Sequence, residues 1–457
     1  MNDPVVFTLN GKTVSLAGQE PSQSLLHWLQ GQRLTGTKEG CGDGDCGACT
    51  VAVVATDEAG RRRYQAVNSC LLPLGSLPGR EVVTVEALAE GDYLHPVQKA
   101  LVDCSGSQCG YCTPGFVMSL FVGSMNGEFG DAVIEGNLCR CTGYRPIREA
   151  AARLAAEPLR SDRFREALEA PAPPLSAARL GNFFSPTTVA DAIELKRQHP
   201  EAQWIQGATD LGVALSRGQP PAAAYIALDR IAELQRLTIE ADTVWIGAGV
   251  SLSVLETELA GVLPAFAEML PAFAARQVKN RASLGGNLGS ASPIGDLLPI
   301  LLALDARILL RGPEGERELP ANGFFLAYRE TARRSAELIV AVIIKRRADW
   351  ITAAYKVAKR QTDDISIVAA VFALRLDDKR RVAEARLAFG GVAATPLRAA
   401  RAEALLLGRL LDEATVAEVA EALADEFQPL DDHRASAQYR RRLCAGLFLR
   451  FVQERLS

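Results

Sequence analysis

Ten cysteines are the residues of this chain best suited to chemistry, because thiolates bind transition metals and take part in redox reactions. Nine of them lie within the first 141 of 457 residues, and Cys444 stands alone in the remainder. In a long chain with no evident secretory signal, cysteines are read as metal ligands or catalytic thiols before disulfides. Their uneven placement therefore predicts metal chemistry in the N-terminal third.

The first cysteine group has the spacing C-x4-C-x2-C, followed by a distant fourth cysteine. Its members are Cys41, Cys46, Cys49 and Cys70. This is the plant-type [2Fe–2S] pattern. The loop also contains Gly40, Gly42, Gly44 and Gly47. We expect these glycines to supply left-handed backbone and N–H groups turned toward sulfur. Zinc sites usually use two short cysteine knuckles, so the x4 gap and the dense glycine argue against zinc.

The second group joins a C-x2-C pair to a C-x-C pair, and no histidine lies near either pair. Its members are Cys109, Cys112, Cys139 and Cys141. Spacing alone leaves zinc and an iron–sulfur cluster both open, although C-x-C is tight for a zinc knuckle. Pro114 and Pro146 follow the two pairs and predict helices that begin there. Such helix starts would stabilise an anionic cluster.

The remaining candidates for chemistry are few. We expect Cys104 and Cys444 to be buried free thiols. The four histidines are scattered, and no hydrolase motif occurs. We therefore assign no catalytic residue to this chain.

Local patterns predict the elements that position the first cysteine group. Residues 5–9 and 12–16 read as a hairpin around Asn10-Gly11, the strongest short turn signal. Residues 24–29 read as a short helix capped by Ser22 or Ser24, and residues 50–56 as a β-branched strand. These elements predict a small ferredoxin-like α+β domain.

The length suggests about three domains at roughly 150 residues each. Residues 86–157 show helical patterns, and residues 158–180 read as a linker stiffened by the proline-rich residues 171–174. An α/β region follows over residues 181–348. A mixed region over residues 349–457 begins with strands and ends with helical patterns at 397–427 and 436–456.

Two glycine-containing segments could hold a nucleotide. They are residues 206–211, after the apolar Trp204-Ile205, and residues 283–296. Glycine and small hydroxylic residues let the backbone approach a pyrophosphate and donate N–H groups to it. Neither segment is a G-x-G-x-x-G fingerprint, and residue types alone leave an ordinary turn open.

Longer strings resemble a known family. Residues 108–118 and 136–146 look like the iron–sulfur domain of the molybdenum hydroxylases, residues 283–296 like their flavin domain, and residues 432–441 like their flavoprotein C-terminal segment. The resemblance covers nearly the whole chain and is closest to small subunits of bacterial xanthine dehydrogenases. It implies an α+β multidomain chain with a β-grasp [2Fe–2S] domain (1–85) and a helical-bundle [2Fe–2S] domain (86–157). A two-part α/β FAD-binding domain (181–348) and an α+β C-terminal domain (349–457) would follow.

The same resemblance implies roles for single residues. The second cysteine group would hold a [2Fe–2S] cluster nearer the molybdenum, and the first group a cluster nearer the flavin. Gln108 is similar to a glutamine that contacts the partner's molybdopterin. Tyr328 and residues 363–365 resemble positions near the flavin ring and the nicotinamide entrance. The implied FAD contacts are Gln206, Gly207, Ala208, Thr209, Asp210, Leu211, Phe273, Ser283, Gly286, Asn287, Ser290, Asp296, Ile339 and Lys356.

Two of these positions depart from the family. The family commonly has Asn and Glu where this chain has Ala208 and Asp210. Both changes leave the backbone donors in place.

A chain with iron–sulfur clusters and flavin converts between one-electron and two-electron chemistry. The sequence shows no evident site at which a substrate could be oxidised. The resemblance implies a large molybdopterin subunit, where xanthine or hypoxanthine would be hydroxylated with oxygen from water. Electrons would pass through both clusters to FAD and then to NAD⁺, giving urate and NADH. The implied assembly is an (αβ)₂ heterotetramer.

Composition limits the other possibilities. The net charge is −4, so nucleic acid is an unexpected partner. Asp305 and Arg307 interrupt the longest apolar stretch, so we expect no membrane span. Residues 1–9 lack a basic start with an apolar core, which predicts a cytoplasmic protein. Three alternatives stay open: an aldehyde, nicotinate or carbon monoxide dehydrogenase, a zinc-binding interaction protein, and a free-standing flavin–iron–sulfur reductase.

Overall fold

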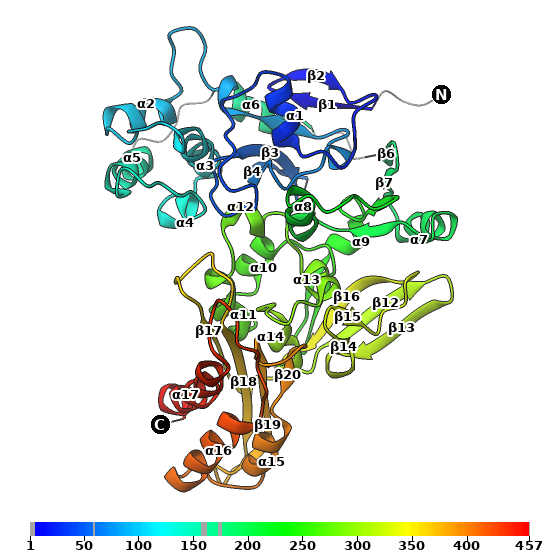
Figure 1. Ribbon diagram of the computed structural model, residues 1–457, viewed down its shortest axis with the longest axis vertical. Helices are drawn as coiled ribbons and strands as arrows, with labels where there is room; N and C mark the ends of the chain where they lie inside the picture. The colour runs from blue at the N-terminus through cyan, green and yellow to red at the C-terminus, as the bar shows by residue number, and fades with distance from the viewer. Residues whose placement is uncertain (1–4, 58–59, 157–161, 172–175, 457) are drawn as a thin grey trace. The chain divides into compact units, whose positions relative to one another are not determined.

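A computed structural model describes residues 5–57, 60–156, 162–171 and 176–456. The described residues form two compact units, which Figure 1 follows in sequence colours. The first contains Met1–Ala232 and Ala275–Ala282, and the second contains Glu233–Ala274 and Ser283–Ser457. The domain limits predicted from the sequence divide the chain more finely than these units and remain predictions.

The first unit opens with a mixed sheet in the order β2-β1-β5-β3-β4. The strands are β1 (Val6–Leu9), β2 (Lys12–Ser15), β3 (Thr50–Thr56), β4 (Arg62–Asn68) and β5 (Glu81–Val83). The predicted hairpin is confirmed: Leu9 pairs with Lys12, and Asn10 and Gly11 have φ of 53° and 78°. Helix α1 (Leu25–Gly31) has Ser24 as its N-cap and buries Trp28 in the core of this sheet. This is the expected β-grasp arrangement.

A helical layer follows in the same unit. Its helices are α2 (Pro96–Asp103), α3 (Thr113–Asn126), α4 (Asp131–Ile134) and α5 (Arg145–Ala156). Pro114 and Pro146 occupy second positions of α3 and α5, so the predicted helix starts are confirmed. Residues 115–125 of α3 are all buried, which makes α3 the central helix, and α2 and α5 pack around it.

Helix α2 is capped by a buried histidine whose protonation should affect stability. His95 Nδ1 accepts from Val97 N at 3.3 Å, and His95 Nε2 lies 3.2 Å from Asp162 Oδ2. Burial lowers the pKa of His95, and the Asp162 carboxylate offsets this only in part. Below about pH 6.5 the unfolded chain therefore binds more protons than the folded chain, so folding stability falls as pH falls.

We expect hydrogen exchange of the α2 amides to accelerate as pH falls from 7 through about 6.5, after correction for intrinsic exchange. The variant His95→Gln should lack this additional pH dependence. An identical pH profile in the two proteins would contradict the assignment.

The segment predicted as a linker contains more structure than expected. Residues 158–161 and 172–175 of it lie outside the described residues. Within the described part, α6 (Arg163–Glu169) forms because Asp162 accepts from the N–H groups of Phe164 and Arg165. Phe164 is buried with the side chains of the helical layer. The sequence did not predict this helix, because its anchor is a distant core that local sequence does not reveal. The linker itself remains a prediction.

The rest of the first unit is a small sheet in the order β6-β7-β9-β8 with flanking helices. Its strands are β6 (Ala178–Leu180), β7 (Phe183–Ser185), β8 (Gln203–Ile205) and β9 (Tyr225–Ala227), and its helices are α7 (Val189–Gln198) and α8 (Thr209–Ser216). Helix α12 (Arg276–Lys279) also belongs to this unit.

The second unit begins at Glu233, within α9 (Ala232–Gln235), and contains a sheet in the order β10-β11-β16-β12-β13. Its strands are β10 (Leu237–Ile239), β11 (Thr243–Gly247), β12 (Arg307–Gly312), β13 (Gly315–Pro320) and β16 (Leu338–Lys345). The helices around it are α10 (Leu252–Glu258), α11 (Pro264–Met269), α13 (Leu284–Ser290) and α14 (Leu298–Ala303). A small hairpin joins β14 (Phe325–Ala327) to β15 (Glu330–Thr331).

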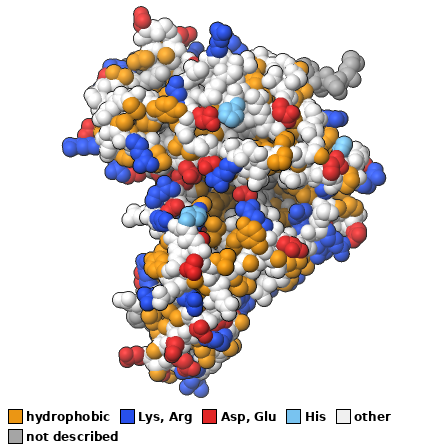
Figure 2. Space-filling view, in the orientation of Figure 1, with side chains coloured by type: hydrophobic (Ala, Val, Ile, Leu, Met, Phe, Trp, Pro, Cys, Tyr) orange, Lys and Arg blue, Asp and Glu red, His pale blue; other side chains and the backbone are white. Residues whose placement is uncertain are grey.

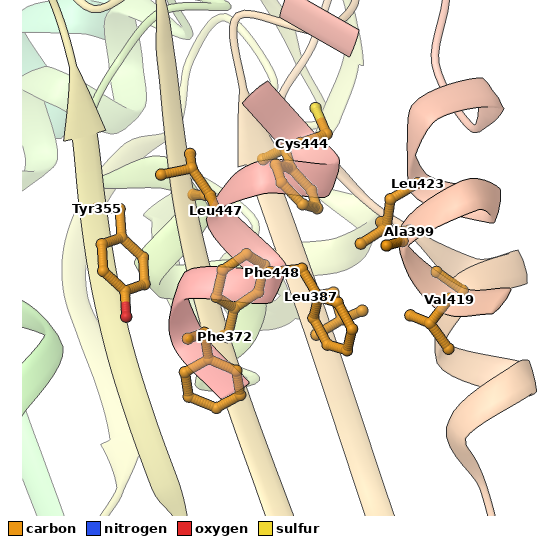
Figure 3. Packing of buried hydrophobic residues seen from close by; sticks show 14 of the residues in the cluster. Tyr355, Phe372, Leu387, Ala399, Val419, Leu423, Cys444, Leu447 and Phe448 are labelled. Carbon is orange, nitrogen blue, oxygen red and sulfur yellow. The ribbon is translucent and has the colours of Figure 1, made fainter. Parts of the chain in front are cut away.

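The C-terminal part of the second unit is a sheet in the order β17-β18-β19-β20 covered by helices. The elements are β17 (Ile351–Val357), β18 (Val368–Leu376), β19 (Val382–Gly390), β20 (Leu397–Arg398), α15 (Ala400–Leu406), α16 (Glu413–Asp425) and α17 (Ala437–Arg455). Figure 3 shows Cys444, Leu447 and Phe448 of α17 packed with Phe372 and Leu387 of the sheet. Cys444 is fully buried, and burial raises the pKa of its thiol to about 12, so it is a core residue as expected.

The surface carries charges of both signs. Basic and acidic side chains are interspersed over the face shown in Figure 2, which agrees with the small net charge of −4. No helix in the described ranges combines the length and the apolar character needed to cross a bilayer.

Candidate functional site

The first cysteine loop has the backbone that its glycines predict. Gly42, Gly44 and Gly47 have φ of 70°, 86° and 65°, a left-handed conformation that other residues adopt at a cost. Gly40 differs, because its φ is not positive. A Cβ there would lie 2.6 Å from Cys46 Sγ, so Gly40 provides room beside the sulfur.

The sulfurs of this loop accept backbone hydrogen bonds and form pairs. The N–H groups of Asp43 and Cys46 point at Cys41 Sγ, at 3.3 and 3.4 Å. Cys49 Sγ and Cys70 Sγ are 3.3 Å apart. A hydrogen bond with Cys46, followed by these backbone bonds, lowers the pKa of Cys41 to about 5 although burial opposes it. Thiolates stabilised by N–H groups suit an iron–sulfur cluster.

The second cysteine group is also drawn together in pairs. A backbone hydrogen bond from Tyr111, and then the neighbouring Cys141, lower the pKa of Cys109. Burial, and then the neighbouring Cys139, raise the pKa of Cys112 to about 12. The N–H of Thr142 lies 3.4 Å from Cys139 Sγ, and the Thr142 hydroxyl lies 3.1 Å from it. Cys112 directly precedes α3, so its sulfur lies at the helix start that the sequence predicted. Cys109 and Cys141 are exposed, whereas Cys139 is buried.

The two cysteine loops touch each other. Leu138, which precedes Cys139, donates its N–H to Cys46 O at 3.0 Å. The adjacent Asn137 donates from Nδ2 to Gly47 O, also at 3.0 Å. This backbone hydrogen bond therefore joins Cys46, a candidate ligand of the first group, to Leu138, which directly precedes the candidate ligand Cys139 of the second group.

Because of this contact, we expect a substitution at Gly47 to affect cluster binding strongly. A Cβ on Gly47 would lie 2.1 Å from Gly136 O and 2.5 Å from Asn137 Nδ2, and its φ is also left-handed. We expect Gly47→Ala to separate the two loops and to lower the iron content of the purified chain.

Gly127 is the matched control for Gly47. Its φ is 73°, but a Cβ there would meet nothing within 4 Å. Gly127→Ala therefore tests only the free-energy cost of placing alanine in a left-handed conformation, about 1 kcal/mol. The purified variant should have the iron content of the wild type. Equal iron loss in both variants would mean that backbone strain, not the contact, is responsible.

The predicted flavin residues of the first unit lie beside the first cysteine group. Gly207 and Ala208 have φ of 68° and 66°, and they lead into α8. A Cβ on Gly212 of α8 would lie 2.6 Å from Leu71 O, so α8 rests directly on the residue after Cys70. Gly207 and Thr209 line a small, mainly apolar pocket with Asn68, Leu71 and Arg281.

In the second unit, further predicted flavin residues gather on α13. The hydroxyl of Ser283 caps this helix by accepting from Gly286 N at 3.0 Å. Ser290 Oγ donates to Asn287 O at 3.0 Å. Asn287 Oδ1 is buried and has no hydrogen-bond partner among the described residues. An acceptor in this position fits a ligand that donates a hydrogen bond.

A buried ion pair holds another predicted group in the second unit. Lys356 Nζ lies 2.8 Å from Asp296 Oδ2 and 2.9 Å from Ala272 O, and 5.9 Å from the ring centre of Phe273. Ser366 donates its hydroxyl to Asp296 Oδ1. The structure thus brings Phe273, Asp296 and Lys356 together. Because the ammonium is already engaged, Lys356 is suited to positioning Asp296 and the 272–273 backbone.

The remaining predicted positions have less defined surroundings. Ile339 is buried on β16, opposite Leu310, beside an irregularity in the strand pairing. Gln108, Tyr328 and Ile365 are exposed. No group of three or more His, Cys, Asp or Glu side chains in the described ranges has the geometry for a single metal ion.

Comparison with known proteins accounts for most of the chain. The 2Fe-2S iron-sulfur cluster binding domain matches residues 7–74, and the [2Fe-2S] binding domain matches residues 84–152. The FAD binding domain in molybdopterin dehydrogenase matches residues 178–345, and the CO dehydrogenase flavoprotein C-terminal domain matches residues 353–455. The chain belongs to the molybdenum hydroxylase family. Each cysteine group lies within a [2Fe-2S] match, which favours iron–sulfur over zinc.

Relatives within this family differ in substrate. The chain is 33% identical to xanthine dehydrogenase of Emericella nidulans over all of its own length and 39% of that protein. It is 30% identical to aldehyde oxidase 4 of Cavia porcellus, over all of its length and 40% of that protein. The chain thus spans about two fifths of the curated relatives it matches.

A solved structure also matches. It is a carbon monoxide dehydrogenase of Hydrogenophaga pseudoflava, at 28% identity and a TM-score of 0.57, covering 60% of this chain and 96% of that one.

Two structural partners were missed by sequence reasoning. Ser366, which bonds Asp296, and Gln277, which contacts the cysteine-loop network, lie far along the chain from their partners. Gln277 lies outside the stretches that resemble the family, so no sequence pattern indicated it. No sequence pattern indicated Ser366 either, although it lies beside the aspartates at 363–364.

Proposed function

We propose that this chain is the electron-transfer subunit of an NAD⁺-dependent xanthine dehydrogenase. In this proposal the chain accepts electrons from molybdopterin on a large partner subunit. It passes them through the second and then the first cysteine group to FAD and NAD⁺. Xanthine or hypoxanthine would be converted to urate on the partner, in a cytoplasmic (αβ)₂ assembly.

The observation that carries this proposal is the order of contacts within the first unit. The second cysteine loop meets the first through Leu138 N and Cys46 O. The first group then meets the predicted flavin segment, because α8 rests on Leu71 beside Cys70. Electron carriers held in this order would form a continuous route.

When bound, [2Fe–2S] clusters supply one-electron transfer, and FAD links it to the two-electron chemistry of NAD⁺. The cysteines of each group would hold one cluster, with N–H groups of Asp43, Cys46 and Thr142 stabilising the sulfur charge. The proposed FAD contacts are residues 206–211 in the first unit and, separately, Ser283, Gly286 and Asn287 in the second unit. The Lys356–Asp296 pair would keep the Phe273 backbone in place.

An anaerobic visible spectrum of the natively purified complex tests the proposal. Adding xanthine should bleach the flavin and iron–sulfur bands, and NAD⁺ should restore them. A coloured protein whose spectrum does not change on addition of xanthine would contradict the substrate assignment. A native preparation that contains no large subunit would contradict the proposed partner.

A second candidate is the same role for another substrate. Relatives named aldehyde oxidase and solved structures named carbon monoxide dehydrogenase favour it. The same spectral experiment distinguishes it when an aldehyde, nicotinate or carbon monoxide replaces xanthine.

A further inference from the structure

A buried amide in the first unit connects the two cysteine loops. Gln277 of α12 is 1% exposed. Its Nε2 lies 3.3 Å from Thr50 Oγ1, 3.2 Å from Ser119 Oγ and 3.2 Å from Asn137 Oδ1. The hydroxyl of Thr50 donates to Gly47 O, and that of Ser119 donates to Asn137 Oδ1. Both hydroxyl hydrogens are therefore committed, and Gln277 acts as the donor.

The partners of this amide adjoin both candidate clusters. Thr50 directly follows Cys49, and Asn137 lies two residues before Cys139. Between them runs the hydrogen bond from Leu138 N to Cys46 O. Fixing Thr50 and Asn137 therefore fixes the residues on either side of the bond that joins the two loops.

The packing around the amide leaves it little freedom. A Cβ on Gly136 would lie 2.1 Å from Gln277 Oε1, so the amide fits only because residue 136 is glycine. A fully buried polar group that is fixed by several partners holds one geometry more strictly than an apolar side chain does.

We propose that Gln277 is a positioning residue for electron transfer between the two iron–sulfur clusters, because its amide keeps Leu138 N on Cys46 O. The proposal rests on the proposed function, since it requires both clusters. In each transfer one electron leaves one cluster and enters the other, and no bond forms or breaks. The rate therefore depends on the separation and on the connecting bonds that Gln277 fixes.

The same segment offers a matched control. Asn280 is also buried and donates from Nδ2 to Ala66 O at 2.9 Å, a strand carbonyl outside the cysteine loops. Gln277→Met removes the amide and keeps the side-chain length. Asn280→Leu removes a comparable buried hydrogen bond without touching Thr50, Ser119 or Asn137.

The test uses the intact complex with four irons per chain. Electron paramagnetic resonance of the fully reduced protein measures the magnetic interaction between the clusters, and freeze-quench experiments measure electron exchange between them. We expect Gln277→Met to alter the interaction and to slow the exchange at least threefold. Asn280→Leu should match the wild type in both measurements. Wild-type values in an iron-replete Gln277→Met protein would overturn the proposal.

Two further variants keep the test decisive if Gln277→Met loses iron. Ser119→Ala removes one acceptor of the amide, and Gly136→Ala crowds the amide from its other side. Both should change the interaction and the exchange rate in the direction expected for Gln277→Met, and wild-type behaviour in both would overturn the proposal. The proposed function fails separately, because wild-type protein without two clusters would contradict that function alone.

Discussion

Replacing Cys139 with alanine should reduce the iron of the purified chain from about four atoms to two. A [2Fe–2S] cluster needs its full set of cysteine ligands. Cys139 is a buried member of the second group; its sulfur accepts the Thr142 N–H and lies 3.1 Å from the Thr142 hydroxyl. The first group should keep its cluster, because its four cysteines are untouched. Iron analysis and the visible spectrum measure both effects.

Cys104→Ala is the matched control for this prediction. Cys104 lies at the end of α2 in the same helical layer and is partly buried, but it belongs to neither group. Its loss should leave the iron content unchanged. Four irons in Cys139→Ala, or two in Cys104→Ala, would show that the second ligand set has been assigned to the wrong residues.

Breaking the buried Lys356–Asp296 pair should strongly destabilise the second unit. Both side chains are nearly inaccessible, at 5% and 6% exposure. Lys356→Met would leave the Asp296 carboxylate buried, with the Ser366 hydroxyl as its remaining side-chain partner among the described residues. Removal of one partner of a buried pair costs about 3–5 kcal/mol. We expect faster hydrogen exchange of the β17 and β18 amides, together with loss of bound flavin.

Two controls separate charge from packing in this prediction. Lys359→Met removes an exposed lysine that donates to His433 O, and it should have little effect. The double variant Lys356→Met with Asp296→Asn removes the unpaired charge, so it should recover at least about 1 kcal/mol relative to the single variant. No recovery would mean that the lost lysine packing, and not the stranded carboxylate, is responsible.

Features with local causes could be predicted from the sequence. The hairpin follows from Asn10-Gly11, whose left-handed angles suit a two-residue turn, and β3 has the bounds that its β-branched run predicts. The helix starts at Pro114 and Pro146 follow from the fixed φ of proline. The cysteine spacing identified both groups, each of which lies within a [2Fe-2S] domain match.

Features with distant causes could not be predicted. Gln277 meets Thr50 across 227 positions, and Lys356 meets Asp296 across 60. No local pattern encodes such pairings, because burial and partner choice are decided by the assembled core. Helix α6 was missed for the same reason, since Phe164 packs in the core of the helical layer.

The interrupted course of the first unit has a consequence for synthesis of the chain. This unit ends at Ala232 but also needs Ala275–Ala282, whose Gln277 and Asn280 supply buried hydrogen bonds to it. A ribosome must therefore extend the chain beyond residue 282 before the unit can complete its core. A fragment that stops at residue 232 should expose the buried hydroxyls of Thr50 and Ser119, and it should load iron less well than the full chain.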